Sequence, residues 1–540
     1  MANNAAAGSD DLFQRKATGL LRGWSVWDGF IYAAFSINLM TLGLLALSYA
    51  PFIPDGSLIL AIILAGLYLV FQTVTYASLI AVMPRAGGDY VWISRVLGGG
   101  LGFVLAVTGW WFILWHWVPI YADLLNKEVF VPLAAILNLD GVLAFFSGST
   151  GLFTSSMIVA ILASLYVSLG MRAYARIQKF CFYGGLVGLA VVIAILLFSS
   201  NADFVTAYNT EARDLFGAGG NAYQETIRAG EEAGGLPTGN AFYPTLLLIP
   251  FLAFFNLYSN WGATLYGEVR GASDFRKNIY AMAGALIFTS IFAVILLLLF
   301  AKTFGWDFYY ASNSAYWGVF YGTIDDAPIT AWPYPGMLVA MLLGNPILQV
   351  ILVAVLSLWF FGWTGSVFLS STRVVFATAF DRVLPEWVSR TTNNGVPYAA
   401  LLLMLIPSIP ISYMYAFGEN FATWTLNATL VIAITFLGSA VSAALMPWLK
   451  PDIYNASPIA RYNVLGIPLI TVSATAFALF AVFCLYQWMT NDIYGLNNTS
   501  SFLYLSTLYV VALGIYVGFR LLRRAQGIDL NMVYDEIPEE

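Results

Sequence analysis

The polar side chains that could do chemistry in this chain are few, and they interrupt long apolar stretches. Tyr258, Ser259 and Asn260 form a run too polar to face lipid, which predicts polar contacts inside the protein. The single histidine, His116, stands between Trp115 and Trp117. Its aromatic neighbours favour a hydrogen-bonded structural role, although an ionisable group inside a membrane is also a candidate functional residue.

The motifs of catalysis and of nucleotide binding are missing. The sequence has no H-E-x-x-H, C-x-x-C or G-x-S-x-G motif, and one histidine cannot build a multi-histidine metal site. No Gly-Lys dipeptide occurs, so a P-loop and ATP-driven transport by this chain are excluded. Basic patches interleaved with aromatics are also lacking, which argues against nucleic acid as a partner. We therefore expect no enzyme activity, no ATP and no metal cofactor.

Composition places these residues in a membrane protein. Of the 540 residues, 60% are hydrophobic and only 10% are charged, whereas a soluble globular protein has about 25% charged residues. The 17 Trp, 31 Tyr and 40 Phe residues fit aromatic belts at both membrane interfaces. Cys181 and Cys484 lie in apolar runs, so we predict two buried thiols and no disulfide.

Twelve stretches are long and apolar enough to cross a bilayer, because a core about 30 Å thick needs roughly 20 apolar residues per helix. Asn345-Pro346 predicts a helix break before the eighth stretch, and Pro407 and Pro410 predict a kink in the ninth. The predicted spans are 25–50, 57–83, 100–122, 152–171, 180–199, 243–266, 278–301, 346–374, 398–416, 421–448, 465–489 and 501–522.

Charge distribution sets the expected orientation. With the N-terminus in the cytoplasm, all 23 Lys and Arg residues except Lys127, Arg213, Arg228 and Lys302 fall on the inner side. The positive-inside rule therefore predicts that both termini are cytoplasmic. The longest outer segment, 200–242, is too short for a domain and is expected to be a cap or a flexible loop.

Three segments resemble those of the amino acid–polyamine–organocation (APC) superfamily. Pro84-Arg85-Ala86-Gly87-Gly88-Asp89-Tyr90 matches its P-R-A-G-G-x-Y loop, and this match is specific. Gly267-Glu268-Val269-Arg270, followed by Arg276-Lys277-Asn278, is similar to its E-E-V-K…R-N stretch. Thr372-Arg373-Val374, followed by Asp381 and Pro385, is similar to its S-R-V…D-x-x-x-P stretch.

The resemblance implies an all-α membrane protein of the LeuT-type fold, with a 5+5 inverted repeat and two further helices. It divides the chain into a cytoplasmic segment 1–24, a first repeat 25–199, an extracellular loop 200–242, a second repeat 243–448, helices 465–522 and a cytoplasmic tail 523–540. Spans one and six are expected to break near the bilayer midplane, where free helix ends can bind a substrate.

The family's substrate positions carry over onto both breaks. In span one, Ser36, Asn38 and Thr41 stand where the family has a glycine cluster, and they offer side chains in place of bare backbone. In span six, Phe254 falls on the aromatic gate and Asn260 on a polar pocket position. The expected lining also includes Tyr258 and Trp363, and it contains no evident acid.

Two positions bear on the coupling ion. Gly185 falls where proton-coupled members carry a lysine, which makes proton coupling the less expected mode. Sodium-coupled relatives of the fold build a Na⁺ site there from span-one carbonyls and span-eight hydroxyls. Thr364, Ser366 and Ser370 are the candidate hydroxyls, and oxygen ligands suit a hard cation. Exchange and uniport without Na⁺ remain open.

The resulting expectation is a secondary transporter of amino acids in the cell membrane, working by alternating access on a small-molecule substrate. Neutral amino acids are favoured, because a polyamine would call for a buried carboxylate partner. The alternatives are a carrier of polyamines or other organic amines, and a non-transporting membrane receptor or accessory subunit.

Overall fold

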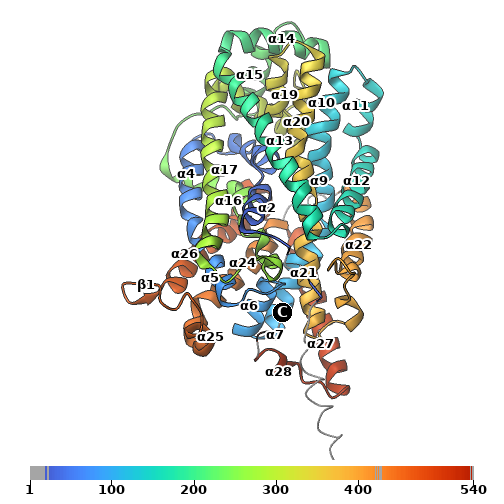
Figure 1. Cartoon of the computed structure of the whole chain (residues 1–540). Helices are drawn as coiled ribbons and strands as arrows, with labels where there is room; N and C mark the ends of the chain where they lie inside the picture. The colour runs from blue at the N-terminus through green and yellow to red at the C-terminus, as the bar shows by residue number, and fades with distance from the viewer. Residues whose placement is uncertain are drawn as a thin grey trace, which may run out of the picture.

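The computed structural model describes residues 19–20, 23–419, 421, 424, 428–535 and 537. Most of the predicted segment 1–24, the start of span ten and the last residues of the tail lie outside this range. Twelve helical segments within it are long and apolar enough to cross a membrane, which confirms the predicted number. The helices stand side by side as one elongated bundle (Figure 1).

The first five spans are single or interrupted helices. Span one contains α2 (Val26–Ile37), a π-helical turn (Leu39–Gly43), α3 (Leu44–Leu47) and a 3-10 turn (Ala50–Phe52), and span two contains α4 (Leu58–Tyr68) and α5 (Val70–Val82). Span three contains α7 (Gly99–Ala106), α8 (Ile113–Trp115), α9 (Trp117–Leu125) and α10 (Val131–Ile136), with π-helical turns at Val107–Phe112 and Asn126–Phe130. Spans four and five are α12 (Ser149–Ser168) and α13 (Met171–Phe198).

Among the remaining seven spans, spans six and eight are interrupted and the others are single helices. Span six contains α16 (Phe242–Asn256) and a 3-10 helix (Trp261–Glu268), and span seven is α17 (Phe275–Thr303). Span eight contains α20 (Pro346–Thr364) and α21 (Ser366–Phe380). Spans nine to twelve are α22 (Tyr398–Phe417), α24 (Ala428–Leu449), α26 (Leu469–Thr490) and α27 (Thr499–Ala525).

Local sequence explains where several helices begin and end. Ser25 and Asp28 form a reciprocal capping box at the start of α2, which satisfies free N–H groups there. Asn345 caps α20 and Pro346 is its first residue, so the predicted break is confirmed, with α19 (Pro335–Met341) ending before it. Pro407 and Pro410 both lie inside α22.

Short elements cover the two ends of the bundle. α14 (Asn201–Phe216) and α15 (Ala222–Glu232) occupy the end that we call the loop end, together with α18 (Trp306–Tyr321) and α19. α6 (Asp89–Val96), α25 (Pro451–Asn455) and α28 (Leu530–Val533) lie toward the opposite, terminal end, with the two-stranded hairpin β1 (Asn463–Val464) and β2 (Ile467–Pro468) (Figure 1). α11 (Asp140–Ser147) joins spans three and four.

The structure bears on two expectations about the loop end. The segment 200–242 is largely helical and α15 packs against α18, so of the two forms expected, a cap or a flexible loop, it is a folded cap. Span three extends to Ile136, well beyond the predicted residue 122. Lys127 therefore lies within the helical span and not in a loop.

Candidate functional site

The helix of span one breaks at Asn38. This residue adopts a left-handed conformation with φ 42° and ψ 78°, which asparagine tolerates better than most residues. Its Nδ2 donates to the carbonyl of Trp359 in span eight at 3.2 Å, whereas its Oδ1 is buried without a hydrogen-bond partner among the described residues. The Ser36 hydroxyl donates to the Tyr32 carbonyl at 2.7 Å.

Span six breaks between Asn256 and Trp261. The turn at 257–260 is tied to span two, because Gln72 Nε2 donates to the Leu257 carbonyl at 2.8 Å and to Asn260 Oδ1 at 3.2 Å. Asn256, the last residue of α16, is fully buried, and in the described part of the chain neither its amide oxygen nor its amide nitrogen has a partner. The break therefore leaves an amide free to bind something else.

A small cavity of about 170 Å³ lies where these breaks meet span three and span eight. All of its lining residues are buried. The lining consists of Ser36, Trp117, Tyr121, Tyr258, Trp261 and Trp363.

Aromatic rings define the shape of this central cavity. Tyr121 and Trp363 stack with their ring centroids 3.5 Å apart, and Trp117 meets Tyr258 edge-on at 5.4 Å. The Tyr258 hydroxyl lies 3.0 Å from Thr429 Oγ1, and Trp261 Nε1 donates to the Ser366 carbonyl. Trp117 Nε1 is buried with no partner among the described residues, so it is a free donor in the wall of the cavity.

The structure brings only part of the predicted substrate set to this cavity. Ser36, Tyr258 and Trp363 line it. Asn38 and Thr41 belong to the neighbouring turn of span one, and Asn260 points to Gln72.

Phe254 lies away from the cavity lining, with its ring 6.3 Å from that of Tyr49 and 6.2 Å from that of Trp488. Sequence reasoning missed the lining residues Trp117, Tyr121 and Trp261. The spacing of Trp117 and Tyr121, four residues apart on one helical face, was the signal that could have found two of them.

The candidate sodium hydroxyls of span eight are all hydrogen-bonded within the protein. Thr364 Oγ1 donates to the Phe360 carbonyl at 2.9 Å, and Ser366 Oγ lies 3.0 Å from the Tyr121 hydroxyl. Ser370 Oγ donates to the Trp261 carbonyl at 2.9 Å and lies 2.8 Å from the Tyr32 hydroxyl. A bound Na⁺ would use their remaining lone pairs.

Gly185 of span five accommodates a tryptophan. Trp359 Nε1 donates to the Gly185 carbonyl at 2.9 Å. A Cβ atom at residue 185 would lie 2.9 Å from that nitrogen, which leaves no room for a side chain. The Trp359 indole thus fills the space where a lysine is expected in proton-coupled relatives.

Two buried ion pairs join elements toward the terminal end. Arg95 of α6 pairs with Asp381, which follows α21, and Arg373 of α21 pairs with Glu268 at the end of span six. Trp24 adds backbone hydrogen bonds to Glu268 and Arg270. The Arg373–Glu268 pair holds span six against span eight, the Arg95–Asp381 pair ties α6 to the end of span eight, and the Trp24 hydrogen bonds attach the start of span one to span six.

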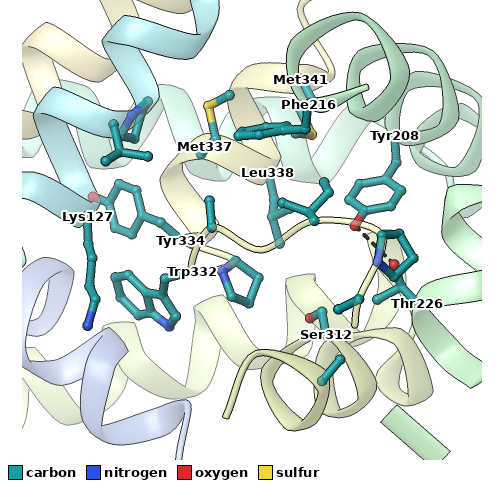
Figure 2. Close-up of a pocket in the computed structure, with 18 residues that line it drawn as sticks. Lys127, Tyr208, Phe216, Thr226, Ser312, Trp332, Tyr334, Met337, Leu338 and Met341 are labelled. Carbon is teal, nitrogen blue, oxygen red and sulfur yellow. Dashed lines mark hydrogen bonds between the residues drawn. The ribbon is translucent and has the colours of Figure 1, made fainter. Parts of the chain in front are cut away.

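A larger cavity of about 520 Å³ lies at the loop end. Figure 2 shows Lys127 and Trp332 on one side of it, with Tyr208 and Thr226 on the other. The Tyr208 hydroxyl lies 3.2 Å from Thr226 Oγ1. Most of the remaining lining is apolar.

His116 is a hydrogen-bonded core residue. Its Nδ1 lies 3.0 Å from the Phe112 carbonyl oxygen, and its Nε2 contacts the Tyr504 hydroxyl of span twelve. Both ring nitrogens are therefore in use, in keeping with the structural role predicted for this residue.

The twelve apolar helices, with breaks in spans one and six beside a central cavity, define a multi-pass membrane protein. The chain belongs to the amino acid permease family, whose model matches residues 29–513, and so to the APC superfamily. A search of curated proteins finds no match. Family membership implies a small-molecule substrate drawn from amino acids and organic cations, and it is membership of a transporter family, not of an enzyme family.

Proposed function

We propose that the chain carries neutral amino acids across the cell membrane by alternating access, with both termini in the cytoplasm. The observation that carries the proposal is the buried, aromatic-lined central cavity at the breaks of spans one and six. Broken helices at membrane depth are tolerated where they line a cavity, and they offer main-chain groups to a polar substrate.

Contacts around the cavity support a rocking mechanism, in which a bundle of spans one, two, six and seven moves against spans three, four, eight and nine. Gln72 of span two binds the turn of span six, which ties two members of the bundle together. The ion pair between Glu268 and Arg373 crosses from the bundle to the other body. Opening toward the cytoplasm would break this pair, and closing would restore it.

The lining favours a substrate with an uncharged side chain. The residues around the central cavity are five aromatics and a serine, with no acid or base. A charged side chain placed there would lose its hydration without gaining a partner, at a cost of several kcal/mol.

The same aromatic lining makes an organic amine the second candidate substrate. A cation over the face of Trp or Tyr gains about 0.5–2 kcal/mol or more when water is excluded. Trp117, Tyr121, Tyr258, Trp261 and Trp363 surround the cavity with such faces.

Uptake into proteoliposomes tests the proposal. Radiolabelled neutral amino acids, then amines, are supplied with and without an inward Na⁺ gradient. Trp363→Leu removes a cavity ring and should abolish uptake. Trp27→Leu, the same change at an exposed position stacked on Phe30, is the control and should leave uptake unchanged.

Each outcome has a distinct meaning. Uptake accelerated by Na⁺ supports symport, and uptake indifferent to Na⁺ supports exchange or uniport. Uptake of amines alone selects the second candidate. Binding without uptake of any compound contradicts transport and favours a receptor or accessory subunit.

A further inference from the structure

Glu128 occupies an unexpected place in span three. It is buried within the helical span, at the π-helical turn Asn126–Phe130. Trp117, Tyr121 and Glu128 are spaced by four and seven residues, which places them along one face of the helix. At 1.5 Å per residue, Glu128 lies roughly 10 Å beyond Tyr121 toward the loop end.

Two buried oxygen atoms without partners face each other at this turn, and a third such atom lies three residues away in span one. The Glu128 carboxylate faces the Thr41 side chain across the gap between spans three and one. In the described part of the chain, neither Glu128 Oε1 nor Thr41 Oγ1 has a hydrogen-bond partner, and the same holds for Asn38 Oδ1 in the same turn of span one. Each of these side chains is at most 4% exposed.

The neighbouring charges leave Glu128 uncompensated. Lys127 Nζ pairs with Asp123 Oδ2 at 2.7 Å, one turn earlier on the same helix, so these two charges cancel. No ion pair of Glu128 occurs among the described residues. A buried carboxylate without a counter-charge is costly, and one positive charge would balance it.

We propose that Glu128, Thr41 and Asn38 form a binding site for one singly charged cation. A carboxylate, a hydroxyl and an amide oxygen are hard ligands, which suit Na⁺ or the hydrogen atoms of an ammonium group. The cation is either an inorganic coupling ion or the ammonium group of the transported substrate. In the second case the inference rests on the proposed function.

The surroundings of the site suit a role in transport. Lys127 and Tyr334 line the larger cavity at the loop end (Figure 2), and Tyr334 lies within electrostatic reach of Glu128. We therefore expect a cation to approach the site from that cavity. Because Thr41 belongs to span one and Glu128 to span three, a cation held between them joins the two bodies that rock in alternating access.

Thermal unfolding of the purified full chain in detergent tests the site. The melting temperature is recorded in NaCl, KCl and N-methyl-D-glucamine chloride at equal ionic strength, and then with L-alanine, L-serine or L-leucine. Propionate, which is L-alanine without its ammonium group, is the matched ligand control. Glu128→Gln and Thr41→Val remove the oxygen ligands at nearly constant volume, and Glu225→Gln on exposed α15 is the control variant.

We expect the stabilising ligand to bind Glu128→Gln about tenfold to hundredfold more weakly than wild type, as for loss of a charge-assisted hydrogen bond. Glu225→Gln should match wild type. If NaCl alone raises the melting temperature of the wild-type protein, the bound cation is inorganic. If L-alanine raises it and propionate does not, the bound cation is the ammonium group of the substrate.

If the ligands raise the melting temperature of Glu128→Gln as much as that of wild type, the site is overturned and the proposed function still stands. If Na⁺ raises the melting temperature only when Glu128 is present, and no amino acid binds, the site is supported and the substrate proposal is contradicted. A wild-type protein that none of these cations or amino acids stabilises also overturns the site.

Discussion

Arg373 and Glu268 form a two-point ion pair between span eight and span six. Arg373 Nε lies 2.6 Å from Glu268 Oε1, and Nη2 lies 3.1 Å from Oε2. The two side chains are 0% and 1% exposed. Both charges are thus fully removed from solvent, and each depends on the other for compensation.

Breaking this pair on one side should be strongly destabilising. We expect Arg373→Gln or Glu268→Gln to lower the free energy of unfolding by about 3–5 kcal/mol, because either change leaves a buried charge alone. The double variant Arg373→Met with Glu268→Gln should recover part of that loss. Arg213→Gln, at the exposed pair with Asp214, is the control and should cost less than about 1 kcal/mol. Denaturation in detergent measures all four, and a fully stable Arg373→Gln would contradict the prediction.

Asp89 should make stability depend on pH. It is the first residue of α6, outside the membrane spans, and it accepts hydrogen bonds from Tyr76, Trp110 and Ser439. Burial raises the pKa of Asp89 from 3.8 to about 6, although these donors oppose the shift. The folded state therefore favours the protonated acid.

The stability that comes from this protonation is complete below pH 3.8 and is lost as the pH rises through about 6. We expect a loss of about 3 kcal/mol over this window relative to Asp89→Asn. Unfolding midpoints of both proteins between pH 4 and 7 measure the difference. If the unfolding midpoints of the two proteins change with pH in parallel, the raised pKa of Asp89 is contradicted.

The sequence predicted the span number and the break before Pro346 because long apolar runs and proline act locally. The lining of the central cavity was harder to predict. Trp117 and Tyr121 look like interface aromatics in sequence, and only the approach of span three to the breaks makes them lining residues. Glu128 was missed because the predicted span three stops at residue 122, whereas the helix continues to Ile136. These predicted bounds leave Glu128 in a loop outside the expected pocket.

Gly185 should tolerate no side chain while Trp359 is present. A Cβ atom would lie 2.9 Å from Trp359 Nε1 and 3.0 Å from its Cε2, so Gly185→Ala should cost about 1–3 kcal/mol through overpacking. Combining it with Trp359→Phe should cost less than the sum of the single changes, because the two sites touch. Gly518→Ala in α27, with nothing within 4 Å of the added carbon, is the control. If the losses in unfolding free energy of the two single variants simply add in the double variant, the added carbon and the Trp359 indole do not conflict, and the prediction is wrong.

Labelling should place the loop end outside the cell. The two native thiols, Cys181 and Cys484, are free and buried, so background reaction should be low. We expect a membrane-impermeant maleimide to label Gly220→Cys on intact cells, since this residue lies in the exposed turn between α14 and α15. Arg524→Cys, near the end of α27, should react only after permeabilisation. The reverse pattern would invert the topology that the positive charges predict.

Asn256 offers a way to separate binding from folding. Because its buried amide has no partner among the described residues, Asn256→Leu removes an unsatisfied group and should leave stability unchanged or higher. If the amide binds substrate, the same change should weaken binding about tenfold or more.

Asn260→Leu is the matched contrast, because it removes the amide oxygen that accepts a hydrogen bond from Gln72 and should lower the free energy of unfolding by about 1–3 kcal/mol. Unfolding and ligand titration are measured on both variants. An Asn256→Leu protein that binds the transported substrate as tightly as wild type would assign the free amide no part in recognition, and the span-six contribution would then come from Tyr258 and Trp261 in the cavity wall.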